Sequence, residues 1–133
     1  MGVNTRGERV YISKYIKLNR FTDLLIYGYT ESMKNFSING FGRIGRLSLR
    51  VWWQYHRDSL QLGAINTSGS MDIEGWAHLL KYDTTYGLFP GDISYEKYQS
   101  AKEVTDSDPL LGYLILNTSY RIPVFAQRDP AKI

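Results

Sequence analysis

The stretch Ile38-Asn39-Gly40-Phe41-Gly42-Arg43-Ile44-Gly45-Arg46 carries most of the structural information in this chain. It contains the pattern G-x-G-x-x-G, between a strand-like segment at residues 36–39 and a helix-like segment from residue 43 to about 57. In such a turn the first glycine permits a sharp bend, the second lets the backbone approach a pyrophosphate, and the third lets the helix pack closely on the strand. The helix start adds free N–H groups and the positive end of a dipole. The stretch therefore predicts a dinucleotide-binding turn.

Other glycine-rich loops fit this stretch less well. A P-loop needs Gly-Lys followed by Ser or Thr, whereas Gly45-Arg46-Leu47 stands here. A kinase loop is followed by a strand of the Val-Ala-x-Lys type, and this sequence has none. The dinucleotide interpretation is therefore the one that the residues around the glycines favour.

The segment after the glycines is expected to be an amphipathic helix. One apolar stripe recurs along it at three- and four-residue steps: Ile44, Leu47, Val51 and Tyr55. The arginines of this segment fall mostly on another face, and they are Arg43, Arg46, Arg50 and Arg57. Apart from Arg43, we interpret these arginines as a solvated helix surface.

The rest of the chain is expected to continue with a second strand and a second helix, followed by three further strands. The strands are expected at 60–66, 93–98, 110–116 and 121–126, the helix from 71 to about 82, and turns at 87–91 and 117–119. Ser70 is the expected N-cap of the second helix. The predicted fold class is α/β, a Rossmann-type dinucleotide-binding fold. Its parallel sheet is incomplete, comprising the first β-α-β half, with an added antiparallel strand region.

Composition limits the functions that this sequence can carry. At 133 residues it is long enough for one domain with its own core, and its net charge of +3 is too small to indicate nucleic acid. The absence of cysteine excludes disulfides, thiolate metal sites and a thiol nucleophile in this sequence. His56 and His78 lie far apart without ligand spacing, and no apolar run has the length of a membrane span. We therefore expect no metal, no membrane and no catalytic residue here.

The sequence resembles the N-terminal part of the phosphorylating glyceraldehyde-3-phosphate dehydrogenases in several blocks, which follow the family's order. The blocks are residues 38–46, Ala64-Ile65-Asn66, Leu79-Leu80-Lys81-Tyr82-Asp83-Thr84-Thr85-Tyr86-Gly87, and Gln127-Arg128-Asp129-Pro130-Ala131-Lys132-Ile133. The resemblance covers residues 33–133 and implies the N-terminal part of an NAD(P)-binding domain, cut before the catalytic domain. Residues 1–32 do not resemble the family and are expected to be an N-terminal extension.

The resemblance also implies which residues contact the cofactor. Arg43 and Ile44 are expected to present backbone N–H groups to the pyrophosphate, and Arg128 is expected to lie beside the adenine. The other expected contacts lie in the glycine turn or at the end of the second strand: Asn39, Gly40, Phe41, Gly42, Gly45, Asn66 and Thr67.

The end of the second strand bears on the choice between NAD and NADP. NAD-preferring members place a carboxylate there, which binds the ribose 2′-hydroxyl and repels a 2′-phosphate. Here Asn66 is followed by the uncharged residues Thr67, Ser68, Gly69 and Ser70. We therefore expect NADP to be tolerated, although no Arg or Lys follows Asn66 to pair with its phosphate.

The family's reaction needs parts that lie downstream of the matched region. It oxidises an aldehyde phosphate through a cysteine thiohemiacetal with a histidine base, and hydride passes to the nicotinamide. Neither His56 nor His78 matches that histidine, and a chain without a thiol cannot form the thioester. We therefore expect this sequence alone to be inactive, to bind the cofactor weakly and to be marginally stable. Full-length members are homotetramers, and we do not expect this fragment to form a proper tetramer. The expected location is the cytoplasm.

Two other functions stay open on the sequence. One is a non-catalytic module that binds nucleotides or RNA, favoured by Arg43, Arg46, Arg50 and the basic residues of 1–32. The other is a non-functional product of a truncated gene. For residues 1–32 themselves, apolar positions at near-helical spacing allow a basic amphipathic helix, against the alternative of an extension without a role.

Overall fold

The computed structural model describes residues 2–3, 9–10 and 33–132, and the chain divides into two compact units, Met1–Lys34 and Asn35–Ile133. In the first unit, β1 (Gly2–Val3) pairs antiparallel with β2 (Arg9–Val10). The amphipathic helix considered for residues 1–32 falls almost wholly outside the described residues. All further elements concern the second unit or its boundary.

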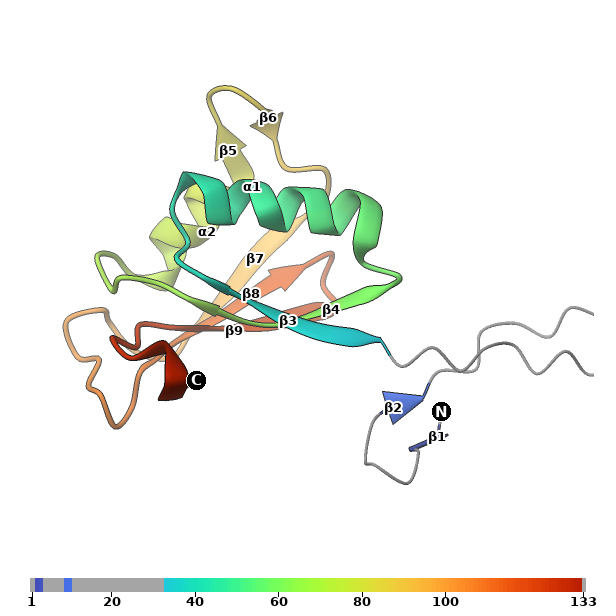
Figure 1. Cartoon of the computed structure of the whole chain (residues 1–133). Coiled ribbons are helices and arrows are strands. Elements are labelled where there is room, and N and C mark those ends of the chain that lie inside the picture. Colours follow the sequence, from blue (N-terminus) through green and yellow to red (C-terminus); the bar gives the residue numbers. More distant parts are fainter. Residues whose placement is uncertain (1, 4–8, 11–32, 133) are drawn as a thin grey trace, which may run out of the picture. The chain divides into compact units, whose positions relative to one another are not determined.

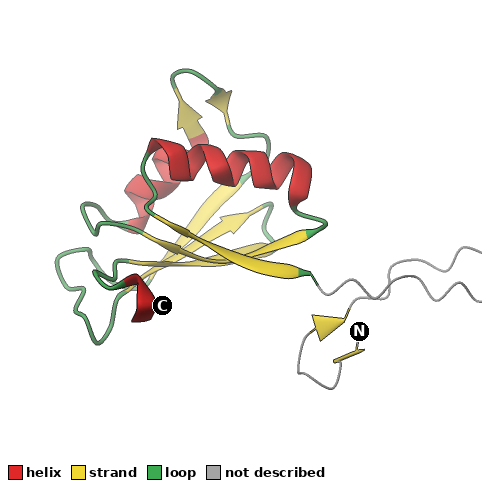
Figure 2. Ribbon diagram, in the orientation of Figure 1, coloured by secondary structure: helices red, strands yellow, loops and turns green. Residues whose placement is uncertain are grey.

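The second unit is built on a five-stranded sheet with the order β3-β4-β9-β8-β7 (Figures 1 and 2). The strands are β3 (Lys34–Asn39), β4 (Leu60–Asn66), β7 (Ile93–Lys97), β8 (Leu110–Leu116) and β9 (Tyr120–Phe125). β4 and β9 run parallel, whereas β8 pairs antiparallel with both β9 and β7. This mixture confirms the predicted α/β class, with a parallel part and an added antiparallel part.

The first β-α-β unit follows the sequence prediction closely. The Gly40 N–H donates to the Asn66 carbonyl at 2.9 Å, so the carboxyl ends of β3 and β4 lie side by side, as they do in a parallel pair. Between the two strands run α1 (Arg43–Val51) and, continuing it, a five-residue π-helix, η1 (Trp52–His56). The predicted helix from residue 43 to about 57 is therefore present, but its last turn is wider than an α-helical turn.

The predicted apolar stripe of this helix faces away from the core. Ile44 is 75% exposed, Val51 49% and Tyr55 73%. The inner face instead carries Gly45 and, at helical steps from it, Leu49 and Trp52, which are buried. The reason is steric, because Gly45 is the point where α1 touches β3, and this contact fixes which positions turn inward.

The interpretation of the helix arginines as a solvated surface is wrong for Arg50, which is only 7% exposed. Its guanidinium donates to four carbonyl oxygens in and beside a two-stranded hairpin: Leu80 at 2.8 Å, Gly87 at 2.9 Å, Leu88 at 3.3 Å and Lys81 at 3.4 Å. The Cζ atom of the guanidinium also lies 5.7 Å from the centre of the Phe89 ring. Four carbonyl acceptors compensate the cost of burying this cation.

The second helix, α2 (Ile73–Lys81), begins later and ends earlier than expected. Its N-cap is Asp72, not Ser70. After it, β5 (Tyr82–Asp83) and β6 (Gly87–Leu88) pair antiparallel, where the sequence predicted the end of a helix and a turn. Figure 1 shows this small hairpin projecting beyond α1, away from the large sheet.

The antiparallel part of the sheet was predicted almost to the residue. The expected turn at 117–119 joins β8 to β9, and Asn117 and Thr118 there adopt positive φ angles of 47° and 61°. A bulge interrupts the β8–β9 ladder between Leu110 and Gly112. Asn suits a left-handed backbone position, which is why the short turn could be recognised in the sequence.

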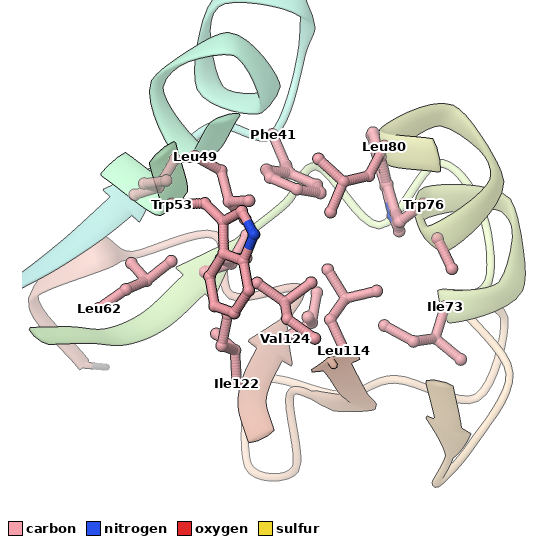
Figure 3. Packing of buried hydrophobic residues seen from close by; sticks show 14 of the residues in the cluster. Phe41, Leu49, Trp53, Leu62, Ile73, Trp76, Leu80, Leu114, Ile122 and Val124 are labelled. Carbon is pink, nitrogen blue, oxygen red and sulfur yellow. The ribbon is translucent and has the colours of Figure 1, made fainter. Parts of the chain in front are cut away.

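The core lies between one face of this sheet and the two helices (Figures 1 and 3). Figure 3 shows Leu49 from α1 and Trp53 from η1 on one side of the core and Trp76 and Leu80 from α2 on the other, with Phe41 between them and the sheet residue Val124 below. Ten side chains of the described second unit are essentially inaccessible: Phe41, Leu49, Ile65, Ile73, Leu80, Leu111, Leu114, Leu116, Ile122 and Val124. The second unit therefore has a continuous core of its own.

We expect Arg50→Met to lower the free energy of unfolding by about 2–4 kcal/mol, because four carbonyl oxygens, one of them in a fully buried hydrogen bond, lose a charged donor. Urea denaturation followed by tryptophan fluorescence measures this. The matched control is Arg57→Met, since Arg57 is exposed and its guanidinium only lies over the Trp53 ring at 4.7 Å. Equal losses in the two variants would show that Arg50 is not the anchor of the hairpin.

The carboxylate of Asp72 accepts hydrogen bonds from the Lys97 ammonium at 2.6 Å and the Ala101 N–H at 2.7 Å. These two donors, Lys97 first, hold the pKa of Asp72 below its ordinary value. A lowered pKa stabilises the fold above the ordinary carboxyl pKa, and this stability is lost as the pH falls through the lowered value.

We therefore expect Asp72→Asn to destabilise the protein at pH 7 and to do so progressively less below about pH 4. Thermal melts between pH 7 and pH 2.5 measure the difference from the wild type. Glu74→Gln, on the exposed first turn of α2, is the control. A destabilisation by Asp72→Asn that stays constant across this range contradicts the assignment.

Candidate functional site

The glycine turn leaves β3 and enters α1 at the edge of the sheet where β3, β4 and β9 end. Gly40 has a φ of +95°, a backbone conformation that glycine adopts without strain. Gly42 is the N-cap of α1, and no side chain caps the helix there. The first bond of the helical ladder joins the Arg46 N–H to the Gly42 carbonyl at 3.0 Å. The N–H groups of Arg43, Ile44 and Gly45 precede that bond, so they point out of the helix end.

The third glycine is required by contact within the protein. A Cβ on Gly45 would lie 2.0 Å from the Gly40 carbonyl oxygen and 3.1 Å from the Ile38 side chain, so only glycine permits this approach. A Cβ on Gly40 or Gly42 would instead have no heavy atom within 4 Å. The first two glycines therefore keep the space beside the turn free, and the third brings helix and strand together, as the sequence pattern predicts.

A cluster of side-chain amides joins the three strand ends behind this turn. Asn66 Nδ2 donates to Asn39 Oδ1 and to the Gln127 carbonyl, both at 2.9 Å, and the Gln127 N–H donates to Asn66 Oδ1 at 2.8 Å. Asn66 is only 6% exposed, and its amide is fully occupied by these bonds. The sequence did not predict that Asn66 and Gln127 hold the strand ends together. Asn66 was expected only to contact the cofactor, and no role was expected for Gln127.

Thr67 is likewise turned inward. Its hydroxyl donates to the Phe125 carbonyl at 3.2 Å and accepts from the Gly69 N–H at 3.2 Å, and the residue is 4% exposed. The next two hydroxyls face solvent instead, since Ser68 Oγ donates to Ser70 Oγ at 3.1 Å and both residues are exposed. The exposed hydroxyls at the end of β4 therefore belong to Ser68 and Ser70 and not to Thr67.

The remaining predicted residues surround the same edge. Phe41 is buried in the core and packs against Trp76 with ring centres 5.8 Å apart. Arg128 is exposed one residue after the amide cluster, and within residues 33–132 its guanidinium has no polar partner. The structure thus brings together the glycine turn, the end of β4 and the segment after β9; Asn66 and Gln127, which are bonded here, are 61 residues apart in sequence.

The charge around the helix start is positive. α1 has no acidic residue in its first turn, and Arg43 and Arg46 stand there. Arg46 Nη1 donates to the Phe41 carbonyl at 3.1 Å, and Arg43 Nη2 donates to the Thr85 hydroxyl at 2.7 Å. Both partners are neutral, so both guanidinium charges add to the positive end of the helix dipole. This arrangement suits an anion such as a pyrophosphate.

In the described part of the chain, no three His, Cys, Asp or Glu side chains come together in a group that could hold a metal ion. No helix among the described residues is long and apolar enough to cross a membrane.

A β-α-β unit with a glycine turn, free N–H groups at the helix start and parallel strand ends beside it defines a Rossmann-type dinucleotide-binding domain. Comparison with known families agrees. The family model described as "Glyceraldehyde 3-phosphate dehydrogenase, NAD binding domain" matches residues 34–133. The chain belongs to this family, and its cofactor is a dinucleotide.

Curated relatives carry the same name. Glyceraldehyde-3-phosphate dehydrogenase 1 of Caenorhabditis elegans is 38% identical over 102 residues, which are 77% of this chain and 26% of that protein. The Haemophilus influenzae enzyme is 41% identical over 96 residues, 72% of this chain and 23% of the relative. The chloroplastic GAPA1 enzyme of Arabidopsis thaliana is 46% identical over 66 residues, 50% of this chain and 16% of the relative. The chain thus spans about a quarter, or less, of the length of these relatives.

We expect Gly45→Ala to lower the free energy of unfolding by more than about 2 kcal/mol, because the added methyl must push α1 off the Gly40 carbonyl. Gly63→Ala is the matched control. Its Cβ would meet nothing closer than the Phe36 carbonyl oxygen at 3.7 Å, an ordinary contact. Chemical denaturation of both variants measures the difference, and equal stabilities would refute the close approach of helix and strand.

Proposed function

We propose that this chain serves as the N-terminal, dinucleotide-binding portion of an oxidoreductase of the glyceraldehyde-3-phosphate dehydrogenase type. The reaction is the oxidation of an aldehyde phosphate with hydride transfer to NAD or NADP. The observation that carries the proposal is the glycine turn at the start of α1, inside a segment that matches the family's NAD-binding domain from residue 34 to 133. The RNA-binding and non-functional alternatives are not favoured, since this match accounts for the same residues.

In this proposal the turn holds the pyrophosphate of the cofactor. Arg43 and Ile44 donate their backbone N–H groups to it, and Gly40, Gly42 and Gly45 allow the backbone to take that shape. Asn39, Phe41, Asn66 and Thr67 border the same site, where the amides of Asn39 and Asn66 support the strand ends. Arg128 lies beside the adenine. Its guanidinium is exposed and has no polar partner among the described residues, which leaves it free for this contact.

The chain contributes binding to the reaction, and its own residues do not perform the chemistry. It has no cysteine, so the covalent step of the family requires a thiol from further polypeptide. We propose that the isolated chain binds the dinucleotide without oxidising an aldehyde, and that it does not form the family's tetramer. The bound dinucleotide would supply the hydride acceptor.

We also propose that NADP is tolerated. The end of β4 carries the exposed hydroxyls of Ser68 and Ser70, 3.1 Å apart, and no carboxylate. A hydroxyl donates a hydrogen bond to a phosphate as readily as it accepts one from a ribose, whereas a carboxylate repels a phosphate.

Residues 1–32 lie outside the dinucleotide-binding domain in this proposal, and the chain acts in the cytoplasm. The domain boundary is supported by the division of the chain between Lys34 and Asn35, and by a family match that begins at residue 34.

Calorimetric titrations of the whole chain with NAD and with NADP test the proposal. We expect both dinucleotides to bind, with dissociation constants within about tenfold of each other. Ser68→Asp should weaken NADP binding by about tenfold or more and change NAD binding less, because it places a negative charge at the end of β4.

Ser119→Asp is the matched control for this experiment, since it adds the same charge in the exposed turn before β9, at the other end of that strand from the site. No binding of either dinucleotide would overturn the proposed function. Binding of NAD alone by the wild type would overturn only the tolerance of NADP.

A further inference from the structure

The side chain of Arg43 is held by a residue that lies 42 positions further along the chain. Its Nη2 donates to the hydroxyl of Thr85 at 2.7 Å, across the exposed surface between the start of α1 and the β5–β6 hairpin. The length fits a charge-assisted hydrogen bond, which is stronger than a bond between neutral groups. The family pattern gives a role to the backbone of Arg43 and none to Thr85, so this contact needs its own explanation.

The hairpin that carries Thr85 is a fixed support. Asp83 Oδ1 accepts from the N–H groups of both Thr85 and Tyr86 at 2.8 Å, which closes the turn. The base of the hairpin is bound by Arg50, whose guanidinium reaches the Gly87 and Leu88 carbonyls. Arg50 belongs to the same helix as Arg43. The hairpin is thus fastened to α1 at both ends, and Figure 1 shows it rising beside that helix.

The choice of a hydroxyl as partner has an electrostatic consequence. Asp83 stands two residues from Thr85, but its carboxylate is engaged by the hairpin N–H groups, and these bonds, with weaker contributions from Arg43 and Arg50, lower its pKa. The structure shows no ion pair between Asp83 and Arg43 among the described residues; the ion pairs there are Lys97–Asp72 and Arg121–Glu96. A neutral acceptor thus fixes the guanidinium, and the charge of Arg43 is compensated only weakly, by the longer-range attraction of Asp83.

A fixed cation at this place is unfavourable for the empty helix. The start of a helix carries partial positive charge, so an arginine in the first turn is repelled unless an anion is present. A guanidinium that is already oriented by Thr85 also loses less side-chain entropy when the anion arrives. Both effects strengthen the attraction of a dianionic group to the start of α1.

We propose that Thr85 is a positioning residue for the pyrophosphate of the dinucleotide, acting through the Arg43 guanidinium, which it holds beside the start of α1 without neutralising it. This inference rests on the proposed function, because it takes the pyrophosphate to lie at the glycine turn. It adds the β5–β6 hairpin, which the sequence did not predict, to the determinants of cofactor affinity.

The test uses the whole chain and three substitutions at the same position. Thr85→Val keeps the shape and removes the acceptor, and we expect it to raise the dissociation constants of NAD and of ADP-ribose by about fivefold. Thr85→Ser keeps the hydroxyl and should restore wild-type binding. Thr85→Asp should pair with Arg43 and weaken binding by about tenfold or more, with a reduced dependence on salt concentration.

The neighbouring Thr84 supplies matched controls. Thr84 is exposed and makes no hydrogen bond within the described part of the chain, so Thr84→Val and Thr84→Asp repeat the same chemical changes one residue away. We expect Thr84→Val to leave binding unchanged and Thr84→Asp to weaken it by less than about threefold, through long-range charge alone. The unfolding free energy of every variant is measured alongside.

The outcomes separate the two proposals. A wild-type chain that binds neither NAD nor ADP-ribose would overturn the proposed function, and this inference with it. Wild-type binding with an unaltered Thr85→Val affinity would overturn the positioning role alone. So would a Thr85→Val variant whose weakened binding is not restored by serine, or is matched by Thr84→Val, since a merely structural contact would give those results.

Discussion

The approach of α1 to β3 at Gly45 is the constraint on which most of this structure depends. A Cβ there would lie 2.0 Å from the Gly40 carbonyl oxygen, so the helix is pressed against the turn that precedes it. This contact sets the rotation of the helix about its axis and thereby sends Leu49 and Trp52 into the core. It also sends Arg50 toward the β5–β6 hairpin and leaves Ile44 and Tyr55 in solvent.

The second constraint is the side-chain amide of Asn66, which binds groups from two other segments of the chain. Its bonds to Asn39 and Gln127 hold the ends of β3 and β9 on either side of β4. A buried amide with all its groups bonded is a specific arrangement, because leaving any of them unpaired costs free energy. Protein contacts therefore fix the strand ends that face the cofactor in the proposed function, independently of any ligand.

The sequence was sufficient for the parts of the fold that depend on local patterns. The glycine spacing predicted the strand, turn and helix, and the alternation of residues 110–116 and 121–126 predicted β8 and β9 closely. It failed where the outcome depends on a distant contact. Arg50 reads as a surface residue because its four acceptors come from the chain 30 to 38 residues later. The inner face of α1 was misjudged because an apolar stripe is normally buried, whereas here the glycine contact decides.

The candidate site shows the same division. Its glycines and exposed residues were predicted, since their roles follow from backbone geometry and from the family resemblance. The inward orientation of Thr67 and the bridging role of Gln127 were not predicted, because each depends on a carbonyl or amide brought close only by folding. Thr85 lies in one of the blocks that resemble the family, but nothing in the sequence around it marks it as a partner of Arg43.

The π-helical turn at Trp52–His56 fixes the end of the first helix that lies opposite the glycine turn. Two consecutive indoles, Trp52 and Trp53, are both buried at the start of this wider turn. Each indole N–H then reaches a different backbone carbonyl, that of Leu60 at 2.8 Å and that of Pro90 at 3.1 Å. These two hydrogen bonds hold the C-terminal end of the helix, and they are independent of the contacts at its glycine end. A substitution at either tryptophan would therefore remove a contact of this end of the helix, without directly touching the contact between Gly45 and the Gly40 carbonyl.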